Sequence, residues 1–327
     1  MSGRPRDSSG ATPDGHVPVL RDRVVALLAP AATAGGVLVD ATLGMGGHAL
    51  ALLEALPQMR LVGIDRDPQA LAFARQRLSA YAGRLSTVHA TYDQLPEVLA
   101  GLGLDRVDGV LFDLGVSSLQ LDEAHRGFSY AHDAPLDMRM DPSVGRTAAD
   151  VVNTYSVDAL ARVLSDYGDE RFARRIAQAV VKARGAGPFT TTAPLAELVR
   201  ESIPAATRRH GGHPAKRTFQ ALRIEVNDEL SVLERALPAA LAALRVGGRV
   251  VALAYHSLED RLVKRAIAPG LLGCICPPDL PVCGCGRTPE LRVVGSKHET
   301  PTAAETAANP RAASARLRAV ERVREAA

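Results

Sequence analysis

The sequence lacks tryptophan, has few cysteines and contains no long apolar run. Four cysteines in 327 residues exclude a disulfide scaffold, because such scaffolds are short and rich in cysteine. No apolar run approaches the roughly 18 residues of a membrane span, so no membrane association is predicted. Residues 1–15 carry charge, proline, glycine and serine without an apolar core, which excludes a signal peptide and predicts a disordered leader. We therefore expect a cytoplasmic protein.

An excess of one charge is also missing. Lys and Arg number 39 against 36 Asp and Glu, and this net charge of +3 argues against a uniformly basic coat or an acidic tail. Lysine is scarce among the basic residues, which reflects either a coding bias or a use of arginine for bidentate phosphate contacts. The hydrophobic content of 46% is ordinary for a globular protein, and the length suits two domains or one domain with an insertion.

Short apolar runs alternate with helical patterns in the first third of the chain. The four runs are GGVLVD (35–40), RLVGID (60–65), RLSTVH (84–89) and VDGVLFD (107–113). Buried strands that alternate with helices predict a parallel, doubly wound α/β sheet.

The pattern then changes to helices without a convincing strand. We predict a first part of the sheet domain at 16–119, a helical insertion domain at 120–214, and a second part of the sheet domain at 215–327. A single long helix is expected from about Lys216 to Leu244, followed by a fifth strand in 247–257 and two short final strands.

A glycine-rich turn, DATLGMGGH (40–48), joins the first strand to its helix. Glycines there let the backbone turn tightly beside a helix N-terminus. Gly44, Gly46 and Ala49 nominally match the dinucleotide fingerprint of NAD-dependent oxidoreductases. Asp40, four residues before the first glycine, fits instead the D-x-x-x-G-x-G pattern of adenosylmethionine-dependent methyltransferases, which we favour. Asp65 ends the next strand, where a carboxylate can accept two hydrogen bonds from a ribose diol.

Two further candidates follow later strands. Tyr92 comes after the third strand, where an aromatic ring can cover an adenine or pack half-buried. Asp113 ends the fourth strand, beside the point where open α/β sheets bind ligands. A carboxylate at the end of a buried strand is costly unless it is hydrogen-bonded, which favours a site role over a helix cap.

Blocks of sequence in a matching order resemble the bacterial ribosomal RNA small-subunit methyltransferase H family over about residues 16–325. The blocks include DATLGMGGHA, GIDRDPQA, DLGVSSLQLD, PLDMRMDP, YGDERFARRIA, HPAKRTFQALRIEVNDEL, YHSLEDRLVK and NPRAASARLR. The resemblance implies a class I (Rossmann-like) S-adenosyl-L-methionine-dependent methyltransferase with a helical insertion domain. It also implies N(4)-methylation of a P-site cytidine, position 1402 of 16S rRNA, within the small ribosomal subunit, and no DNA partner.

The same resemblance implies a set of cofactor-binding positions. They are Gly46, Gly47, His48, Asp65, Tyr92, Asp113 and Gln120. The chain departs from the family at Leu119, where proline is frequent, and at Tyr255, where phenylalanine precedes HSLEDR. Neither departure removes a chemical group, so we expect activity. A non-catalytic ribosome assembly factor remains an alternative, although it would require a degraded cofactor loop.

The exocyclic amine of cytosine is a poor nucleophile, so a catalytic site needs acceptors for its protons. The chain lacks the Asn/Asp/Ser-Pro-Pro-Tyr/Phe segment of many amine methyltransferases and has DLGVS (113–117) there. The candidate catalytic residues are therefore Asp113, Ser117 and His256. His256 would take the proton after transfer, or it forms a structural hydrogen bond in the SLEDR turn.

Basic residues gather in segments 169–184 and 208–223 and in the tail, and the first two lie in or beside the insertion. This distribution predicts a face that binds RNA phosphates, with a solvated helix face as the alternative. The candidate RNA contacts are Arg139, Arg171, Arg174, Arg175, Lys216, Arg217 and Phe219. Arg139 could instead pair with Asp137 or Asp141, and Phe219 could stack on a flipped base or pack in a core.

All the cysteines lie in one loop, as Cys274, Cys276, Cys283 and Cys285. Four thiolates could close a tetrahedral structural zinc site. The C-x-C pairs are tighter than the usual zinc spacing, so a disulfide and plain reduced thiols remain alternatives.

Overall fold

A computed structural model describes residues 17–32, 35–205, 213–274, 276 and 284–325. The predicted leader at 1–15 lies outside the described residues. The chain forms two compact units. The first unit combines Met1–Gly115 with Val232–Ala327, and the second unit is Val116–Ser231. The second unit is thus inserted between two halves of the first.

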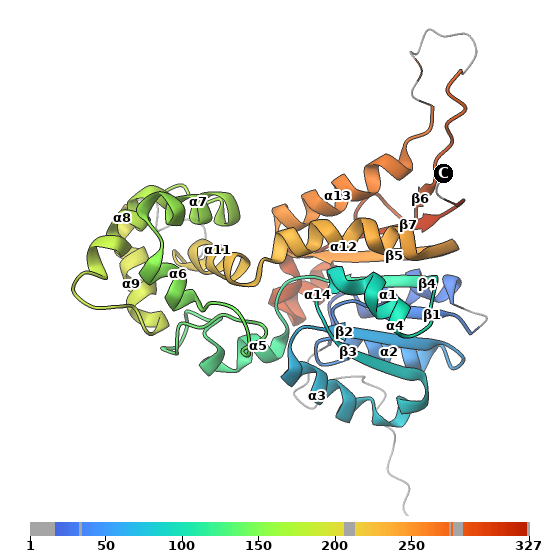
Figure 1. The fold of residues 1–327 in the computed structure, drawn as a ribbon, viewed down its shortest axis with the longest axis horizontal. Coiled ribbons are helices and arrows are strands. Elements are labelled where there is room, and N and C mark those ends of the chain that lie inside the picture. The colour runs from blue at the N-terminus through green and yellow to red at the C-terminus, as the bar shows by residue number, and fades with distance from the viewer. Residues whose placement is uncertain (1–16, 33–34, 206–212, 275, 277–283, 326–327) are drawn as a thin grey trace, which may run out of the picture. The chain divides into compact units, whose positions relative to one another are not determined.

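The first unit is built on one seven-stranded sheet with the order β3-β2-β1-β4-β5-β7-β6 (Figure 1). Its strands are β1 (Val37–Asp40), β2 (Arg60–Asp65), β3 (Leu85–His89), β4 (Val107–Asp113), β5 (Leu244–Ala254), β6 (Leu291–Val293) and β7 (Arg316–Arg322). The pairs from β3 through β5 are parallel, and β7 is antiparallel to both β5 and β6. The predicted doubly wound sheet is confirmed, with one reversed strand near its edge.

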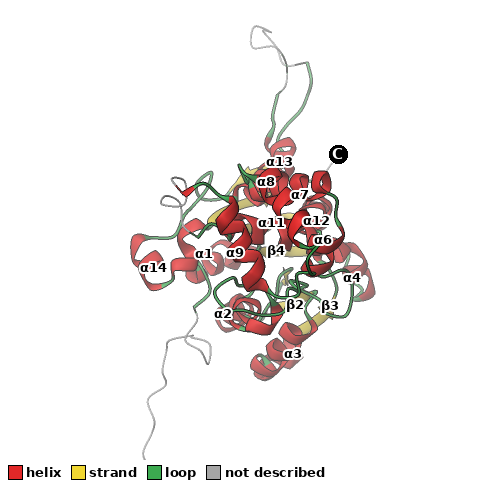
Figure 2. Ribbon diagram, turned by 90° about the vertical axis from the view of Figure 1, so that its left-hand side faces the viewer, coloured by secondary structure: helices red, strands yellow, loops and turns green. Residues whose placement is uncertain are grey.

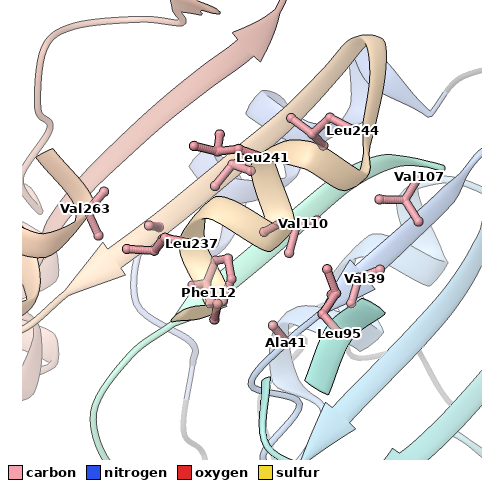
Figure 3. Packing of buried hydrophobic residues seen from close by; sticks show 14 of the residues in the cluster. Val39, Ala41, Leu95, Val107, Val110, Phe112, Leu237, Leu241, Leu244 and Val263 are labelled. Atoms are coloured by element: carbon pink, nitrogen blue, oxygen red, sulfur yellow. The ribbon is translucent and has the colours of Figure 1, made fainter. Parts of the chain in front are cut away.

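Alternate residues of the strands enter two separate hydrophobic cores, because successive side chains of a strand point to opposite faces. Val110 and Phe112 of β4 face a core shared with α4 and α12 (Figure 3). Leu111 between them faces a core shared with α1, α2 and α3. The central strands β1, β2 and β4 are buried on both faces, which explains why they appear in the sequence as continuous apolar runs.

Helices cover both faces of this sheet. In chain order they are α1 (Arg21–Leu28), α2 (Gly47–Ala55), α3 (Pro68–Arg77), α4 (Leu95–Gly101), α12 (Glu229–Ala243), α13 (Ser257–Leu271) and α14 (Ala303–Ala308). Short 3₁₀ turns are η1 (Ala29–Ala31), η2 (Ser79–Arg84), η3 (Tyr92–Gln94) and η5 (Pro310–Ser314). Each fully buried aliphatic side chain in the two cores contributes about 1.5–3 kcal/mol to stability.

The second unit is helical in the elements that the structure describes (Figure 2). They are α5 (Ser118–Asp122), η4 (Ala124–Arg126), α6 (Ala148–Thr154), α7 (Val157–Gly168), α8 (Ala173–Ala183), α9 (Thr192–Ser202) and α11 (Lys216–Asn227). The unit has its own core, to which α11 contributes Phe219 and Leu222. For this reason the unit extends beyond the predicted insertion limits of 120–214 at both ends.

The single helix expected from Lys216 to Leu244 is wrong in one respect. The structure divides it into α11 and α12 at Asp228, whose φ of 49° lies in the left-handed region. Aspartate tolerates this conformation better than most residues. The break therefore needs no glycine or proline, the residues that would signal it in the sequence. The break falls between a helix of the second unit and a helix that continues into the first.

Among the helices that the structure describes, none combines the length and the apolar character required to cross a bilayer.

Candidate active site

Three parallel strands of the first unit end on an aspartate at the same edge of the sheet. These residues are Asp40 on β1, Asp65 on β2 and Asp113 on β4. The strands are neighbours in the order β2-β1-β4, so their carboxyl ends bring the three carboxylates to one place. This edge is where parallel α/β sheets bind their ligands.

The glycine-rich turn leads from this edge into α2. Gly44 and Gly46 have φ angles of 51° and 75°, in the left-handed region that glycine adopts without strain. A Cβ on Gly46 would lie 2.9 Å from a terminal side-chain carbon of Leu78, so a larger residue there requires Leu78 to shift. Gly46 is the N-cap of α2, and no side chain caps this helix. Its first-turn N–H groups are therefore directed at the carboxyl edge with a favourable dipole for an anion.

Asp65 holds this turn in place. Its Oδ2 accepts a hydrogen bond from the Gly44 N–H at 2.6 Å, and its Oδ1 accepts one from the Asp67 N–H at 2.8 Å. Burial raises the pKa of Asp65 to about 6, although these two hydrogen bonds act to lower it. Each carboxylate oxygen keeps a second lone pair, which leaves capacity for the hydroxyls of a ribose.

A cluster of charged groups lies beside the turn. The Nε2 atom of His48 lies 3.5 Å from Oδ2 of Asp113, at the outer limit of a hydrogen bond. Burial alone would lower the pKa of His48, but Asp113 and Asp40 raise it in the balance. Asp40 is 1% exposed, and burial raises its pKa to about 7. These groups therefore make a largely buried site of mixed charge, in which the pKa of Asp40 lies near neutral pH.

Two residues outside the predicted site position Asp113. The hydroxyl of Tyr255 donates a hydrogen bond to Oδ1 of Asp113 at 2.7 Å, and Oγ1 of Thr42 accepts one from the Asp113 N–H at 2.7 Å. Burial, and then the charge of Asp113, raise the pKa of Tyr255 well above its usual value, so the phenol stays a donor. The departure from phenylalanine at Tyr255 was visible in the sequence, but its partner was not.

Tyr92 opens η3 directly after β3 and is half-buried. Its ring packs edge-on against Phe112, with ring centres 5.8 Å apart and planes at 88°. One part of the ring thus belongs to the core, and the contact of Tyr92 with an adenine stays a prediction.

His256 is engaged in the turn at the start of α13. It is the N-cap of α13, and its Nδ1 accepts from the Glu259 N–H. Its Nε2 lies 3.1 Å from Oε1 of Glu259, whose other oxygen accepts from the Tyr255 N–H at 2.7 Å. The structure therefore gives His256 the structural role in the SLEDR turn.

Ser117 and Gln120 belong to the second unit. They form a capping box at the start of α5, in which Ser117 Oγ accepts from the Gln120 N–H and Gln120 Oε1 accepts from the Ser117 N–H. The hydroxyl of Ser117 can still donate a proton, because the cap uses it only as an acceptor.

The predicted RNA contacts in the second unit fall into three groups. Exposed side chains are Arg171, Arg174, Arg175, Lys216 and Arg217. Arg139 is engaged in a two-pronged ion pair with Asp137, at 2.9 and 2.8 Å. Phe219 is 3% exposed and packs edge-on against Tyr130, so it serves the core and its proposed stacking on RNA is corrected.

The cysteine loop joins α13 to β6 in the first unit. Cys274, Cys276 and Cys285 bring their sulfur atoms within 4.8 Å of one another. Cys283 lies outside the described residues.

S-adenosyl-L-methionine presents a ribose diol, a carboxylate, and an ammonium and sulfonium group. Asp65 suits the diol, the uncapped N-terminus of α2 suits the carboxylate, and the carboxylates of Asp40 and Asp113 suit the cationic groups. A dinucleotide would bring a pyrophosphate against these carboxylates, which repel it. The site therefore fits the sulfonium cofactor and disfavours the oxidoreductase alternative.

The strand order with its reversed β7, the glycine turn and the acidic edge define a class I methyltransferase, an enzyme class that uses S-adenosyl-L-methionine. The chain belongs to the MraW methylase family, whose model matches residues 14–323.

Named relatives agree with this assignment. The chain is 62% identical to "Ribosomal RNA small subunit methyltransferase H" of Thermobifida fusca, over 97% of this chain and 96% of that protein. It is 60% identical to the protein of the same name from Saccharopolyspora erythraea, over 99% and 98%. A solved rRNA methylase from Streptococcus thermophilus is 12% identical, with a TM-score of 0.42 over 92% of this chain and 95% of that one. This last likeness is too distant to add to the family match.

Proposed function

We propose that this enzyme transfers a methyl group from S-adenosyl-L-methionine to the exocyclic N(4) amine of a P-site cytidine in 16S rRNA, within the small ribosomal subunit. The observation that carries this proposal is the near-complete coverage, at 62% identity, of a relative named for the ribosomal RNA of the small subunit. The intact glycine turn and acidic edge support catalysis over a purely structural role in ribosome assembly. Because ribosomes work in the cytoplasm, we expect the protein to act there.

Bound S-adenosyl-L-methionine supplies an electrophilic methyl group that an in-line nucleophile can displace. Asp65 would hold the ribose, and the first turn of α2, including Gly47 and His48, would hold the carboxylate end. Fixing both ends aligns the reacting atoms, which is the main contribution of such an enzyme. Tyr92 would cover one face of the adenine.

The target amine must lose a proton when it is methylated. Asp113 offers a carboxylate that is 27% exposed at the end of β4, and Tyr255 holds one of its oxygens. We assign to Asp113 the role of acceptor that orients the amine, with Ser117 in the following turn as a second candidate. His256 is the weaker candidate because both of its ring nitrogens face Glu259.

The exposed basic side chains of the second unit would bind rRNA phosphates. On α8 the apolar side chains Ile176 and Val180 are buried, while Arg174 and Arg175 point to solvent. The ion pair of Arg174 with Asp158, at 3.1 Å, joins two highly exposed side chains and is easily exchanged for a phosphate.

The function is tested by incubating the full chain with labelled S-adenosyl-L-methionine and small subunits that lack the modification. Mass spectrometry of the nucleosides and of rRNA fragments should locate the label on N(4) of one cytidine. Free 16S rRNA, tested in parallel, should be the poorer acceptor. Label on a ring carbon or a ribose would overturn the proposed chemistry. Cofactor binding without transfer to either substrate would favour the assembly-factor alternative.

The RNA face is tested by replacing Arg174 and Arg175 together with glutamate. Binding to small subunits should weaken and depend less steeply on salt, because fewer phosphate contacts release fewer counterions. The control is Arg60→Glu, which reverses an exposed charge at the amino end of β2, on the other edge of the sheet. Equal losses in both variants would argue against a specific face.

A further inference from the structure

The loop between α13 and β6 has little apolar packing to hold it. None of the described residues from Leu272 to Glu290 is buried. Its two limbs leave the ends of α13 and β6 and run side by side away from the sheet (Figures 1 and 2). Hydrogen bonds join the limbs at their base, from the Glu290 N–H to the Gly270 carbonyl at 2.8 Å and from Arg287 to the Pro269 carbonyl at 3.0 Å. Beyond this base, some other interaction must hold the limbs together.

Three cysteines meet where that interaction is needed. Cys274 and Cys276 lie on the limb that follows α13, and Cys285 lies on the limb that returns to β6. Their sulfur atoms lie within 4.8 Å of one another. In the described parts of the chain, this is the single group of three or more Cys, His, Asp or Glu side chains with converging ligand atoms.

The distance between two of the sulfur atoms excludes a disulfide and fits a shared zinc ion. The Sγ atoms of Cys274 and Cys285 are 3.8 Å apart, well beyond the roughly 2.05 Å of a disulfide. A tetrahedral zinc ion with Zn–S bonds of about 2.3 Å separates its sulfur ligands by about 3.8 Å. The observed separation therefore equals an edge of a zinc–thiolate tetrahedron.

We propose that Cys274, Cys276 and Cys285 bind a structural zinc ion that ties the two limbs of this loop together. All-sulfur donor sets select zinc, copper(I) or iron–sulfur clusters, and zinc alone needs no redox partner or assembly machinery. Because the ligands come from both limbs, the ion links the limbs and takes the place of the apolar packing that the loop lacks.

The test is the metal content of the full chain, purified without chelator from zinc-supplemented cells and measured by plasma mass spectrometry. We expect about one zinc per chain, and less than about a tenth of that when Cys274 and Cys285 are both replaced by serine. The matched control is Leu272→Ser, which adds a serine to the same exposed limb and should keep the zinc. Replacing zinc with cobalt should give the absorption bands of tetrahedral cobalt thiolate.

Several outcomes would overturn the proposal. They are a wild-type chain without zinc, zinc retained in the double variant, iron and sulfide in place of zinc, and a Cys274–Cys285 disulfide in protein purified under reducing conditions. Binding of S-adenosyl-L-methionine by the double variant would show that any loss of zinc is not a failure to fold, because no residue of this loop belongs to the proposed cofactor site.

Discussion

Replacing Asp65 with asparagine tests the cofactor site most directly. The carboxylate accepts the Gly44 N–H at 2.6 Å and the Asp67 N–H at 2.8 Å and has one lone pair per oxygen left for the ribose hydroxyls. Asparagine replaces one of these oxygens with an NH₂ group, which cannot accept a hydrogen bond and is repelled by the backbone N–H that faces it. The variant therefore loses a hydrogen bond to a charged acceptor. A hydrogen bond of this kind contributes about 1.5–3 kcal/mol, so affinity for S-adenosyl-L-methionine should fall about 10- to 150-fold.

A second aspartate in the same sheet provides the control. Oδ2 of Asp108, near the amino end of β4, accepts a hydrogen bond from the Val37 N–H at 2.7 Å. Asp108→Asn therefore disturbs a similar contact between strands, but at the opposite edge of the sheet. Both variants should lose stability in urea unfolding, and only Asp65→Asn should lose cofactor affinity in titration calorimetry. If affinity changed less than about threefold in Asp65→Asn, or equally in both variants, the assignment of the ribose to Asp65 would be refuted.

Three further predictions concern the same edge of the sheet. Burial raises the pKa of Asp40 to about 7 and of Asp65 to about 6. Cofactor affinity should therefore be retained above pH 7 and fall on acidification, as these carboxylates are protonated. An affinity that stays constant in calorimetric titrations from pH 8 to pH 5 would contradict this. Tyr255→Phe removes the hydrogen bond to Asp113 and should lower the free energy of unfolding by about 1–2 kcal/mol, measured in urea, while turnover persists; unchanged stability would show that the bond contributes nothing. Gly46→Ala places a Cβ at a φ of 75° and should cost about 1–2 kcal/mol in thermal unfolding and weaken cofactor binding, whereas a neutral result would show that the turn readily rearranges.

Much of the first unit could be predicted from the sequence because its central strands, β1, β2 and β4, are buried on both faces. Such strands appear as continuous apolar runs, and three of them end on the aspartates Asp40, Asp65 and Asp113. The glycine turn is equally visible, since Gly44 and Gly46 occupy backbone conformations that favour glycine. These signals are local, so a single sequence carries them.

Other features depend on contacts between residues far apart in the chain. Phe219 is aromatic and lies beside basic residues, and only the packing of α11 in the second core shows that its ring is covered. His256 resembles a catalytic base in sequence, and only the partner Glu259 shows it to be a helix cap. The Tyr255–Asp113 hydrogen bond joins β4 to the end of β5, and no local pattern predicts it.

The insertion also has a consequence for how the chain folds as it is synthesised. Val110 of β4 pairs with Val250 of β5, and the entire second unit lies between them in the chain. Until β5 emerges from the ribosome, one edge of β4 has unpaired backbone groups, whereas α7, α8 and α9 can pack against close sequence neighbours at once. The second unit should therefore complete its core first, although most of the sheet precedes it. Substitutions that delay its folding prolong the exposure of β4, so their first visible effect should be aggregation of nascent chains.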